Sequence, residues 1–314
     1  MSRYIARRLV LLVPVLLGIS IIVFALIRVA PGGPGRALFG PAAPPEQIER
    51  FNQKYGLDKP VPVQYVIWLQ GVVTGDLGQS LINSLPVTAL IPSKLVPTTL
   101  VTLFAMLLSI PIGLVAGLIA ALRRGRRTDR LSRFVFLLGL SMPSFWLGII
   151  LLVLFAVVLR WLPAGGYVPI EKDPIGSLRS LLLPAVTLAI PISAVLSRVV
   201  RTATLAAMDE EYVRTARSKG LPERIVIRRH MLRNVALPTV TTIGLQVGYL
   251  FGGAALIETV FTIPGVGRGL VDAVTNRDYA MVQGLTLVIA LMTVLTALVV
   301  DLLYVYLDPR VRVG

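Results

Sequence analysis

The stretch EYVRTARSKGLPERIVIRRHMLRNVALP occupies residues 211–238 and lies between two long apolar segments. After Glu211 it carries a single acid, Glu223, against seven basic side chains: Arg214, Arg217, Lys219, Arg224, Arg228, Arg229 and Arg233. A lipid bilayer cannot hold so much charge, so the stretch lies in water on one side of a membrane. Gly220 is placed to end one helix, and Pro222 suits the first turn of the next. We therefore predict two short helices joined by a tight turn, which form a cytoplasmic docking element.

The composition of the chain is that of a membrane protein. Apolar residues make up 55 % of the 314 residues, and the mean hydropathy is +0.79, well above that of ordinary globular domains. The absence of cysteine excludes disulfides and thiol chemistry, and one histidine, His230, leaves no room for a histidine-based metal site. The net charge of +15 could suggest nucleic-acid binding, but the arginines gather at the ends of apolar segments. We therefore expect neither a metal nor a nucleic-acid partner.

Apolar runs of a length that crosses a bilayer occur six times. They cover approximately residues 9–29, 100–122, 134–159, 181–207, 239–257 and 281–307. The first run is too long and too apolar for a cleaved signal peptide, so it is predicted to be a retained span. The predicted fold class is an all-α integral membrane protein with six transmembrane helices.

The distribution of lysine and arginine predicts the orientation of these spans. With the N-terminus inside, 20 of the 31 basic residues and about 7 of the 16 acids lie on the inner side. This excess is typical of cytoplasmic segments. An even number of spans places the C-terminus inside as well. The chain is thus predicted to be a multi-pass protein of the bacterial cytoplasmic (inner) membrane with both termini cytoplasmic.

The first outer loop, residues 30–97, is the only sizeable predicted piece outside the membrane. It opens with PGGPG at 31–35, which cannot continue a helix. Residues 46–55 suit a short polar helix, and residues 63–73 an apolar one at the membrane interface. No outer piece is large enough for an independent substrate-binding domain. We predict one transmembrane domain, 1–314, with this outer loop and a cytoplasmic loop at 208–238, which contains the docking element.

Motifs for catalysis are missing from the sequence. It has no G-x-x-x-x-G-K-[ST] loop for ATP, no H-E-x-x-H and no G-x-S-x-G. Gly265, Gly267 and Gly269 fail the G-x-G-x-x-G spacing and are interpreted as a structural turn. Glu258 and Asp301 lie near span ends rather than at the midplane, so we expect them to pair or snorkel near an interface rather than to relay protons. The chain is not expected to be an enzyme.

Small and polar residues mark candidate packing and pathway positions inside the spans. Gly244, Gly248 and Gly252 are four residues apart, and Gly113 and Gly117 repeat that spacing. Such glycines let another backbone approach, either within the chain or at a subunit interface. Polar side chains could line a water-filled pathway or bond to their own helix backbone. The candidates for the pathway are Thr98, Thr99, Thr102, Ser109, Ser141, Pro143, Ser144, Ser193 and Gln246.

A series of motifs runs in order along nearly the whole chain. They are YIARRL at 4–9, GLDKPVPVQY at 56–65, GDLGQS at 75–80, SMPSFWLG at 141–148, WLPAGGY at 161–167, EYVRTARSKGL at 211–221, RHMLRN at 229–234, ETVFTIPGVG at 258–267, RDYAMVQG at 277–284 and DPR at 308–310. In this series the chain resembles a permease subunit of the dipeptide/oligopeptide/nickel family of ABC importers, the B-type permease with a long first outer loop. It departs from that family at PGGP, 31–34, where PGDP is usual. Of the general importer loop pattern E-A-A-x-x-x-G it keeps only Ala216 and Gly220.

This resemblance implies a type I ABC importer permease fold and an alternating-access mechanism. A second homologous permease would complete the pathway, one or two ATP-binding subunits would hold ATP and Mg²⁺, and an extracellular solute-binding protein would deliver the substrate. The chain itself would bind no cofactor. Peptides are the expected substrate, with nickel chelates, glutathione or another small solute as alternatives. The residues implied to couple the chain to the ATP-binding subunit are Glu211, Tyr212, Arg214, Ala216, Lys219, Gly220, Leu221, Pro222, Arg224, Arg229, His230 and Arg233.

Two other functional classes predict features that the sequence lacks. A stand-alone secondary transporter predicts ionisable residues at the midplane or an inverted repeat. An intramembrane enzyme requires a catalytic set of side chains. The ABC permease interpretation needs neither feature.

Overall fold

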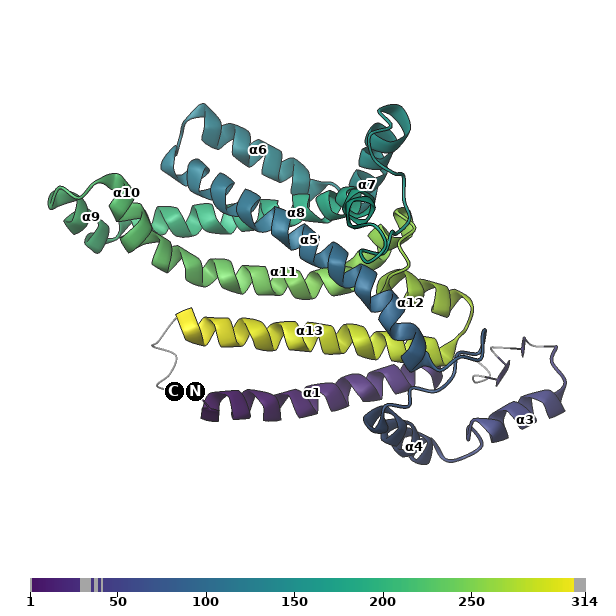
Figure 1. Cartoon of the computed structure of the whole chain (residues 1–314). Helices are drawn as coiled ribbons and strands as arrows, with labels where there is room; N and C mark the ends of the chain where they lie inside the picture. Colours follow the sequence, from purple (N-terminus) through teal and green to yellow (C-terminus); the bar gives the residue numbers. More distant parts are fainter. Residues whose placement is uncertain (1, 29–34, 37–38, 41, 308–314) are drawn as a thin grey trace. The chain divides into compact units, whose positions relative to one another are not determined.

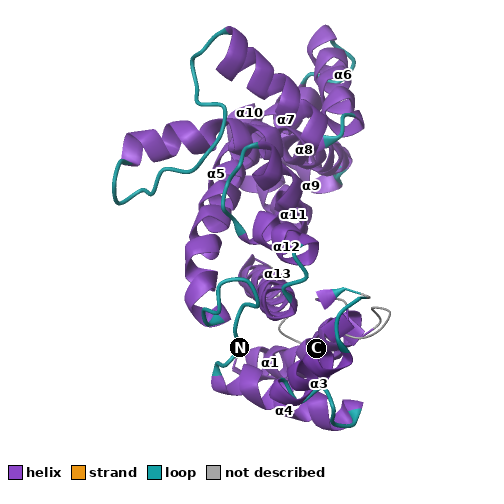
Figure 2. Cartoon of the chain, turned by 90° about the vertical axis from the view of Figure 1, so that its right-hand side faces the viewer, coloured by secondary structure: helices purple, strands orange, loops and turns teal. Residues whose placement is uncertain are grey.

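The computed structural model of the chain is built almost entirely of helices joined by loops (Figure 1, Figure 2). It describes residues 2–28, 35–36, 39–40 and 42–307. Outside its helices, this described part holds one isolated bridge, between Gln79 and Pro86. The predicted features at 31–34 and 308–310 lie outside the described residues. The all-α prediction is confirmed for the part of the chain that the structure describes.

The chain divides into two compact units, each with its own buried core. The first comprises Met1–Pro97 and Pro264–Val294, and the second comprises Thr98–Ile263 and Leu295–Gly314. Two long helices, α5 (Val87–Leu122) and α13 (Tyr279–Leu307), contribute to both units. The other helices of the first unit are α1 (Ser2–Arg28), α3 (Pro45–Lys54), α4 (Val61–Thr74) and α12 (Val266–Thr275).

The first unit confirms the helices expected in the outer loop. α3 matches the polar helix predicted at 46–55, and α4 matches the apolar helix predicted at 63–73. α5, however, begins inside the loop predicted at 30–97. α4 packs on α1, where the ring of Phe24 meets those of Tyr65 and Trp68 at centroid distances of 5.2 and 5.6 Å. This packing leaves Tyr65 and Trp68, which lie in the helix predicted for the membrane interface, partly buried.

A buried aspartate links two distant motifs of the first unit. Asp278 is 1 % exposed and accepts hydrogen bonds from the Ser80 hydroxyl, from the amide of Leu81 at 3.2 Å and from the amide of Met281 at 3.3 Å. The Met281 amide belongs to the first turn of α13, so Asp278 also caps that helix. The GDLGQS and RDYAMVQG motifs are therefore parts of one interlocked turn.

The second unit is organised around one central helix, α8 (Pro174–Asp209). Its N-terminus is capped by Asp173, which accepts a hydrogen bond from the amide of Gly176 at 2.9 Å. In the apolar stretch of α8 that is long enough to cross a bilayer, 72 % of the residues are buried, because α6, α7 and α11 pack around it. The other helices of this unit are α6 (Arg127–Ser141), α7 (Ser144–Leu152), the π-helical η1 (Val153–Val158), α9 (Glu211–Ser218), α10 (Glu223–Ile225), the π-helical η2 (Val226–Met231) and α11 (Leu232–Val260).

Four helical segments are long and apolar enough to cross a bilayer. They are Val87–Leu122, Pro174–Asp209, Asn234–Val260 and Tyr279–Val300. They correspond to the second, fourth, fifth and sixth predicted spans. The first predicted span falls on α1, whose apolar part within the described residues, Val10–Ala25, is shorter.

The third predicted span, 134–159, is not one continuous helix. α6 and the α7–η1 helix meet at an angle of 101°. Met142 has the extended torsion angles φ −84° and ψ 128°, as the residue before a proline commonly does, and Pro143, with ψ 132°, is the residue just before α7. The prediction of a single spanning helix at 134–159 is corrected to a bent pair of helices. The described residues thus hold four spanning helices, or five if this pair crosses as one.

Candidate coupling surface

The basic stretch forms a helical hairpin at the end of α8 and α11 (Figure 1). α8 ends where Glu210 becomes extended, with φ −72° and ψ 144°. α9 then turns Val213 and Ala216, three residues apart, toward the interior. Both are buried in an apolar cluster whose other members are Val200, Ala207, Val226, Met231 and Val235. This cluster joins the hairpin to the two long helices that it connects.

The turn after α9 has the predicted left-handed glycine. Gly220 has φ +75°, and its amide donates to the carbonyl of Arg217 at 2.9 Å, while the amide of Leu221 donates to the carbonyl of Ala216 at 3.3 Å. These two bonds define a Schellman motif. A Cβ atom at Gly220 would meet nothing within 4 Å, so the torsion angle rather than space requires glycine here. Pro222 is extended, with ψ 137°, and precedes α10 instead of lying in its first turn.

An ion pair spans the same turn. The Arg217 guanidinium donates two hydrogen bonds to the Glu223 carboxylate, at 2.6 and 3.1 Å. This bond holds the pKa of the Glu223 carboxyl below its ordinary value and raises the pKa of Arg217. Sequence analysis did not assign either residue to the site. The available signal was that Glu223 is the only acid of the run after its first residue.

A second polar contact ties α9 to α11. The Asn234 side-chain amide donates to the Tyr212 hydroxyl at 2.6 Å. Between α10 and α11 the chain passes through η2, whose wider turns are frequent at functional sites. Asn234 was predicted as part of a motif, and its role in holding Tyr212 was missed because the partners are 22 residues apart.

The predicted coupling residues divide into an inner and an outer set. Ala216 is buried, and Tyr212, Leu221 and His230 are partly buried. Ala216, Tyr212 and Leu221 belong to the apolar cluster that joins the hairpin to α8 and α11. The outer set is exposed and presents mainly positive charge; it comprises Glu211, Arg214, Lys219, Gly220, Pro222, Arg224 and Arg229, with Arg228 beside them. The side chain of Arg233 lies outside the described part of the structure.

The glycine pattern of the spans has two different explanations. In α5, a Cβ at Gly113 would lie 2.6 Å from the Cβ of Leu196, and one at Gly117 would lie 2.7 Å from the carbonyl oxygen of Ser197. These glycines therefore allow α5 to approach α8 within the chain. In α11, a Cβ at Gly244 would overlap Val300 of α13.

Gly252 on α11 shows no such close contact. A Cβ at Gly252 would meet nothing within 4 Å, and Gly252 is exposed. Gly248, Gln246 and Ser144 are partly buried, and Pro143 is exposed. Gly252 is thus available for a partner, whereas Gly244 is occupied by packing within the chain.

Several polar candidates bond to their own helix. Ser141 donates to the carbonyl of Leu137 and Ser193 to that of Ile190, both at 2.8 Å. For these two, the alternative of backbone bonding describes the structure. Among the described residues, no group of three or more His, Asp or Glu side chains is placed to hold a metal ion.

Glu258 is buried rather than snorkelling. It is 0 % exposed and accepts a hydrogen bond from the Thr98 hydroxyl at 2.5 Å. The Thr98 hydroxyl therefore donates to a carboxylate on another helix, α11. The side chain of Asp301 lies outside the described part of the structure.

Comparison with known protein families identifies both halves of the chain. Residues 113–313 match the family described as binding-protein-dependent transport system inner membrane component. Residues 1–102 match the N-terminal model of such membrane components. A crystal structure of an amino acid ABC transporter with histidines matches 69 % of this chain and 94 % of its own chain, with a TM-score of 0.51 and 18 % identity. At that identity the likeness supports the fold alone.

Curated relatives match over nearly the full length. A probable peptide ABC transporter permease protein of Sinorhizobium fredii is 39 % identical over 99 % of this chain and all of its own. A dipeptide transport system permease protein of Alkalihalophilus pseudofirmus is 38 % identical with the same coverage. A glutathione transport system permease protein of Escherichia coli is 40 % identical over 99 % of each chain. The resemblance found in the sequence motifs is confirmed: the chain belongs to the family of inner membrane components of binding-protein-dependent transport systems.

Proposed function

We propose that the chain is the transmembrane permease subunit of an ATP-driven importer that moves peptides across the bacterial cytoplasmic membrane by alternating access. The observation that carries the proposal is the hairpin α9–α10. It is packed on α8 and α11 through a buried apolar cluster, yet presents exposed basic side chains outward. This combination suits an element that docks on a separate protein and moves two long helices.

The proposed mechanism begins at the hairpin. Two ATP-binding subunits would hold ATP and Mg²⁺, since this chain has no phosphate-binding loop. Their closure would displace the hairpin of this chain and that of a second, homologous permease. The apolar cluster and the Tyr212–Asn234 hydrogen bond would pass the displacement to α8 and α11. ATP binding can shift the equilibrium only because the docked subunit contacts the two states differently.

The charge of the hairpin suggests the chemistry of its partner. The exposed arginines would meet acidic residues on the ATP-binding subunit, so docking should weaken as ionic strength rises. Gly220 and the Arg217–Glu223 pair would keep the two short helices at a constant angle. The glutamate of the general importer loop pattern has no counterpart in this chain, because Arg214 stands at that position.

The proposed topology has six spans, both termini in the cytoplasm and one transmembrane domain, 1–314. α1 would be the first span and the bent α6–α7 pair the third. The loop 30–97 would face outward and the loop 208–238 inward. Because the chain has no cysteine, single cysteines at Arg124, Arg228, Gln79 and Tyr167 can be labelled in whole cells with an impermeant thiol reagent. Labelling of the last two alone is expected, and labelling at Arg228 would contradict the topology.

Peptides are the proposed substrate class, delivered by an extracellular solute-binding protein. The full-length similarity to peptide and dipeptide permeases supports this class. The similarity to a glutathione permease favours glutathione as a second candidate. Purification of the intact complex and identification of the bound small molecule would distinguish them.

Reconstitution tests the function as a whole. The complex of this chain, its partner permease and the ATP-binding subunits is placed in proteoliposomes with the solute-binding protein. We expect uptake of labelled peptide that requires ATP. The purified chain alone should hydrolyse no ATP, and turnover in a preparation free of any ATP-binding subunit would refute the assignment.

A further inference from the structure

The turn between α5 and α6 concentrates positive charge. Residues 123–133, RRGRRTDRLSR, contain six arginines and one acid, Asp129. Five of these arginines precede or begin α6 and are exposed: Arg123, Arg124, Arg126, Arg127 and Arg130. This set is called the arginine turn below.

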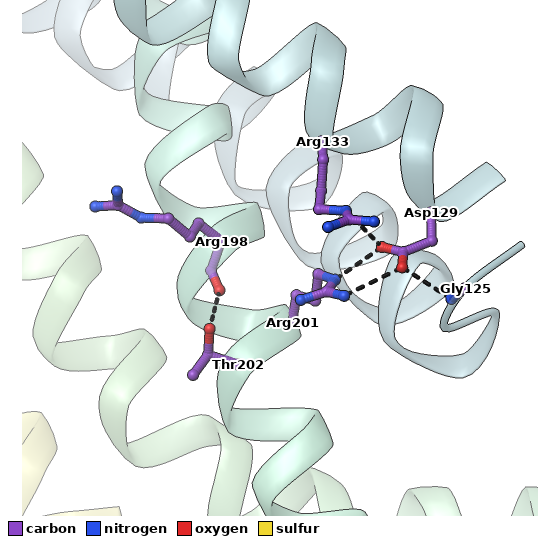
Figure 3. A network of polar contacts seen from close by, with 6 residues as sticks. All are labelled: Gly125, Asp129, Arg133, Arg198, Arg201 and Thr202. Atoms are coloured by element: carbon purple, nitrogen blue, oxygen red, sulfur yellow. Dashed lines mark hydrogen bonds and ion pairs between the residues drawn. The ribbon is translucent and has the colours of Figure 1, made fainter. Parts of the chain in front are cut away.

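The single acid of this segment, Asp129, is paired with arginines outside the arginine turn (Figure 3). Asp129 is 1 % exposed and accepts two hydrogen bonds from Arg201 of α8, at 2.9 and 3.1 Å. It also accepts the amide of Gly125 at 3.0 Å and lies 3.5 Å from Arg133. Asp129 therefore holds the turn against α8. Its charge is balanced by Arg201 and Arg133, neither of which belongs to the arginine turn. Within the part of the chain that the structure describes, no ion pair involves the five arginines of the turn.

The surface beside the arginine turn is apolar. Leu131, Phe134 and Val135 of α6 are 64 %, 60 % and 53 % exposed, and Leu122 at the end of α5 is also exposed. The turn is thus the charged end of helices whose outward sides are hydrophobic. A bilayer fits both parts, because its hydrocarbon covers the apolar side chains while its phosphates lie at the level of the arginines. A soluble partner would match the charge and leave the adjoining apolar side chains uncovered.

We propose that the arginine turn binds the phosphate groups of anionic phospholipids in the leaflet that it faces. The planar guanidinium group suits this role because it can donate two hydrogen bonds to one phosphate. Asp129 acts as a positioning residue, which holds the turn at the level of the headgroups. Assignment of the leaflet as cytoplasmic rests on the proposed topology, whereas lipid binding itself does not depend on that topology or on transport.

The test compares two variants of the purified full-length chain in neutral micelles. One replaces four arginines of the turn with glutamine, and the other removes the same charge from the coupling hairpin. The turn variant carries Arg123→Gln, Arg124→Gln, Arg126→Gln and Arg127→Gln, and the control carries Arg214→Gln, Arg224→Gln, Arg228→Gln and Arg229→Gln. Phosphatidylglycerol or phosphatidylcholine is then titrated, and bound lipid is counted by native mass spectrometry alongside the melting temperature.

We expect wild type and the hairpin control to bind phosphatidylglycerol with similar affinity and in preference to phosphatidylcholine. The turn variant should bind it at least about tenfold more weakly, because each basic side chain near an anionic surface contributes to binding. A second turn variant with lysine at the same four positions should retain most of the binding. Since the lysine variant keeps the charge, it also separates loss of the site from loss of folding.

Three results would overturn the proposal. Equal binding of phosphatidylglycerol by the turn variant and wild type would show that the turn is not the site. Displacement of the lipid by millimolar inorganic phosphate, with the same rise in melting temperature, would assign a site for free phosphate. Loss of the ATP-binding subunit from the purified complex of the turn variant, with lipid binding unchanged, would assign the turn to a protein contact. None of these results depends on uptake, so failure here is distinct from failure of the proposed transport function.

Discussion

The substitution Gly220→Val tests the geometry of the hairpin that we propose couples the chain to its ATP-binding subunit. At φ +75° a β-branched side chain is forced into a strained backbone conformation, which costs about 1–3 kcal/mol. No neighbouring atom lies within 4 Å of the new Cβ position, so this cost comes from the backbone and not from overlap. A free-energy change of this size shifts an equilibrium by about 5- to 150-fold. The substitution should therefore depopulate the observed hairpin while leaving the spans intact.

The assay measures two activities of the reconstituted complex, namely substrate-stimulated ATP hydrolysis and peptide uptake. We expect Gly220→Val to insert into the membrane and to dock the solute-binding protein, but to hydrolyse ATP without uptake or to lose the ATP-binding subunit. Gly220→Asn is the matched control, because asparagine tolerates the left-handed region better than other residues with a side chain. It should retain most of the coupling.

Two outcomes would refute this reasoning. Wild-type values of both activities in Gly220→Val would mean that Gly220 plays no special part in coupling. Equal loss in the asparagine and valine variants would mean that backbone strain is not the cause.

The remaining predictions concern stability, measured by thermal unfolding of the purified chain. Asp278→Ala should cost about 1–3 kcal/mol for each buried donor that it leaves unpaired, and an unchanged melting temperature would contradict the interlocked turn. Gly244→Leu should destabilise by about 1–3 kcal/mol because it overlaps the end of α13, whereas the control Gly252→Leu on the same helix should not; equal melting would contradict that packing. Glu223→Gln should cost about 0.2–1 kcal/mol at pH 7, since the pair with Arg217 is partly exposed. Because the pKa of Glu223 is lowered from 4.5, this difference should shrink as the pH falls below 4.5 and vanish below the lowered pKa; a constant difference would exclude the pair as its cause.

Local features of the fold were accessible from the sequence, and contacts across it were not. The turn at Gly220 was predictable because a glycine followed by Leu-Pro ends a helix by its own torsional preferences. The pairs Asp129–Arg201, Asp278–Ser80 and Thr98–Glu258 join residues 72, 198 and 160 positions apart. The sequence shows each acid but not the residue that it contacts. The free-energy cost of burying an unpaired charge indicates only that a partner must exist.

The prolines of the spans show that a proline in an apolar segment can mark a bend or lie inside a continuous helix. Pro143 coincides with the 101° bend between α6 and α7, whereas Pro184 and Pro191 lie inside the continuous α8. α8 is mostly buried and is held by α6, α7 and α11, so its neighbours stabilise a helix that has lost two backbone hydrogen bonds. α6 and α7 have many exposed side chains and fewer such supports. The bend was signalled by the residue before Pro143, but the sequence gives no measure of the surrounding support.

The contacts of the second unit also decide which helices can move together. The apolar cluster around Val213 and the Tyr212–Asn234 bond join the hairpin to α8 and α11. The Asp129–Arg201 pair joins α6 to the same end of α8 (Figure 3). Separating α6 from α8 would leave the buried Asp129 carboxylate without its partner, which would strongly destabilise the fold. The pair therefore resists separation of the two helices. We therefore expect a force applied at the hairpin to move α6, α8 and α11 together, which is the kind of displacement that the proposed alternating-access mechanism requires.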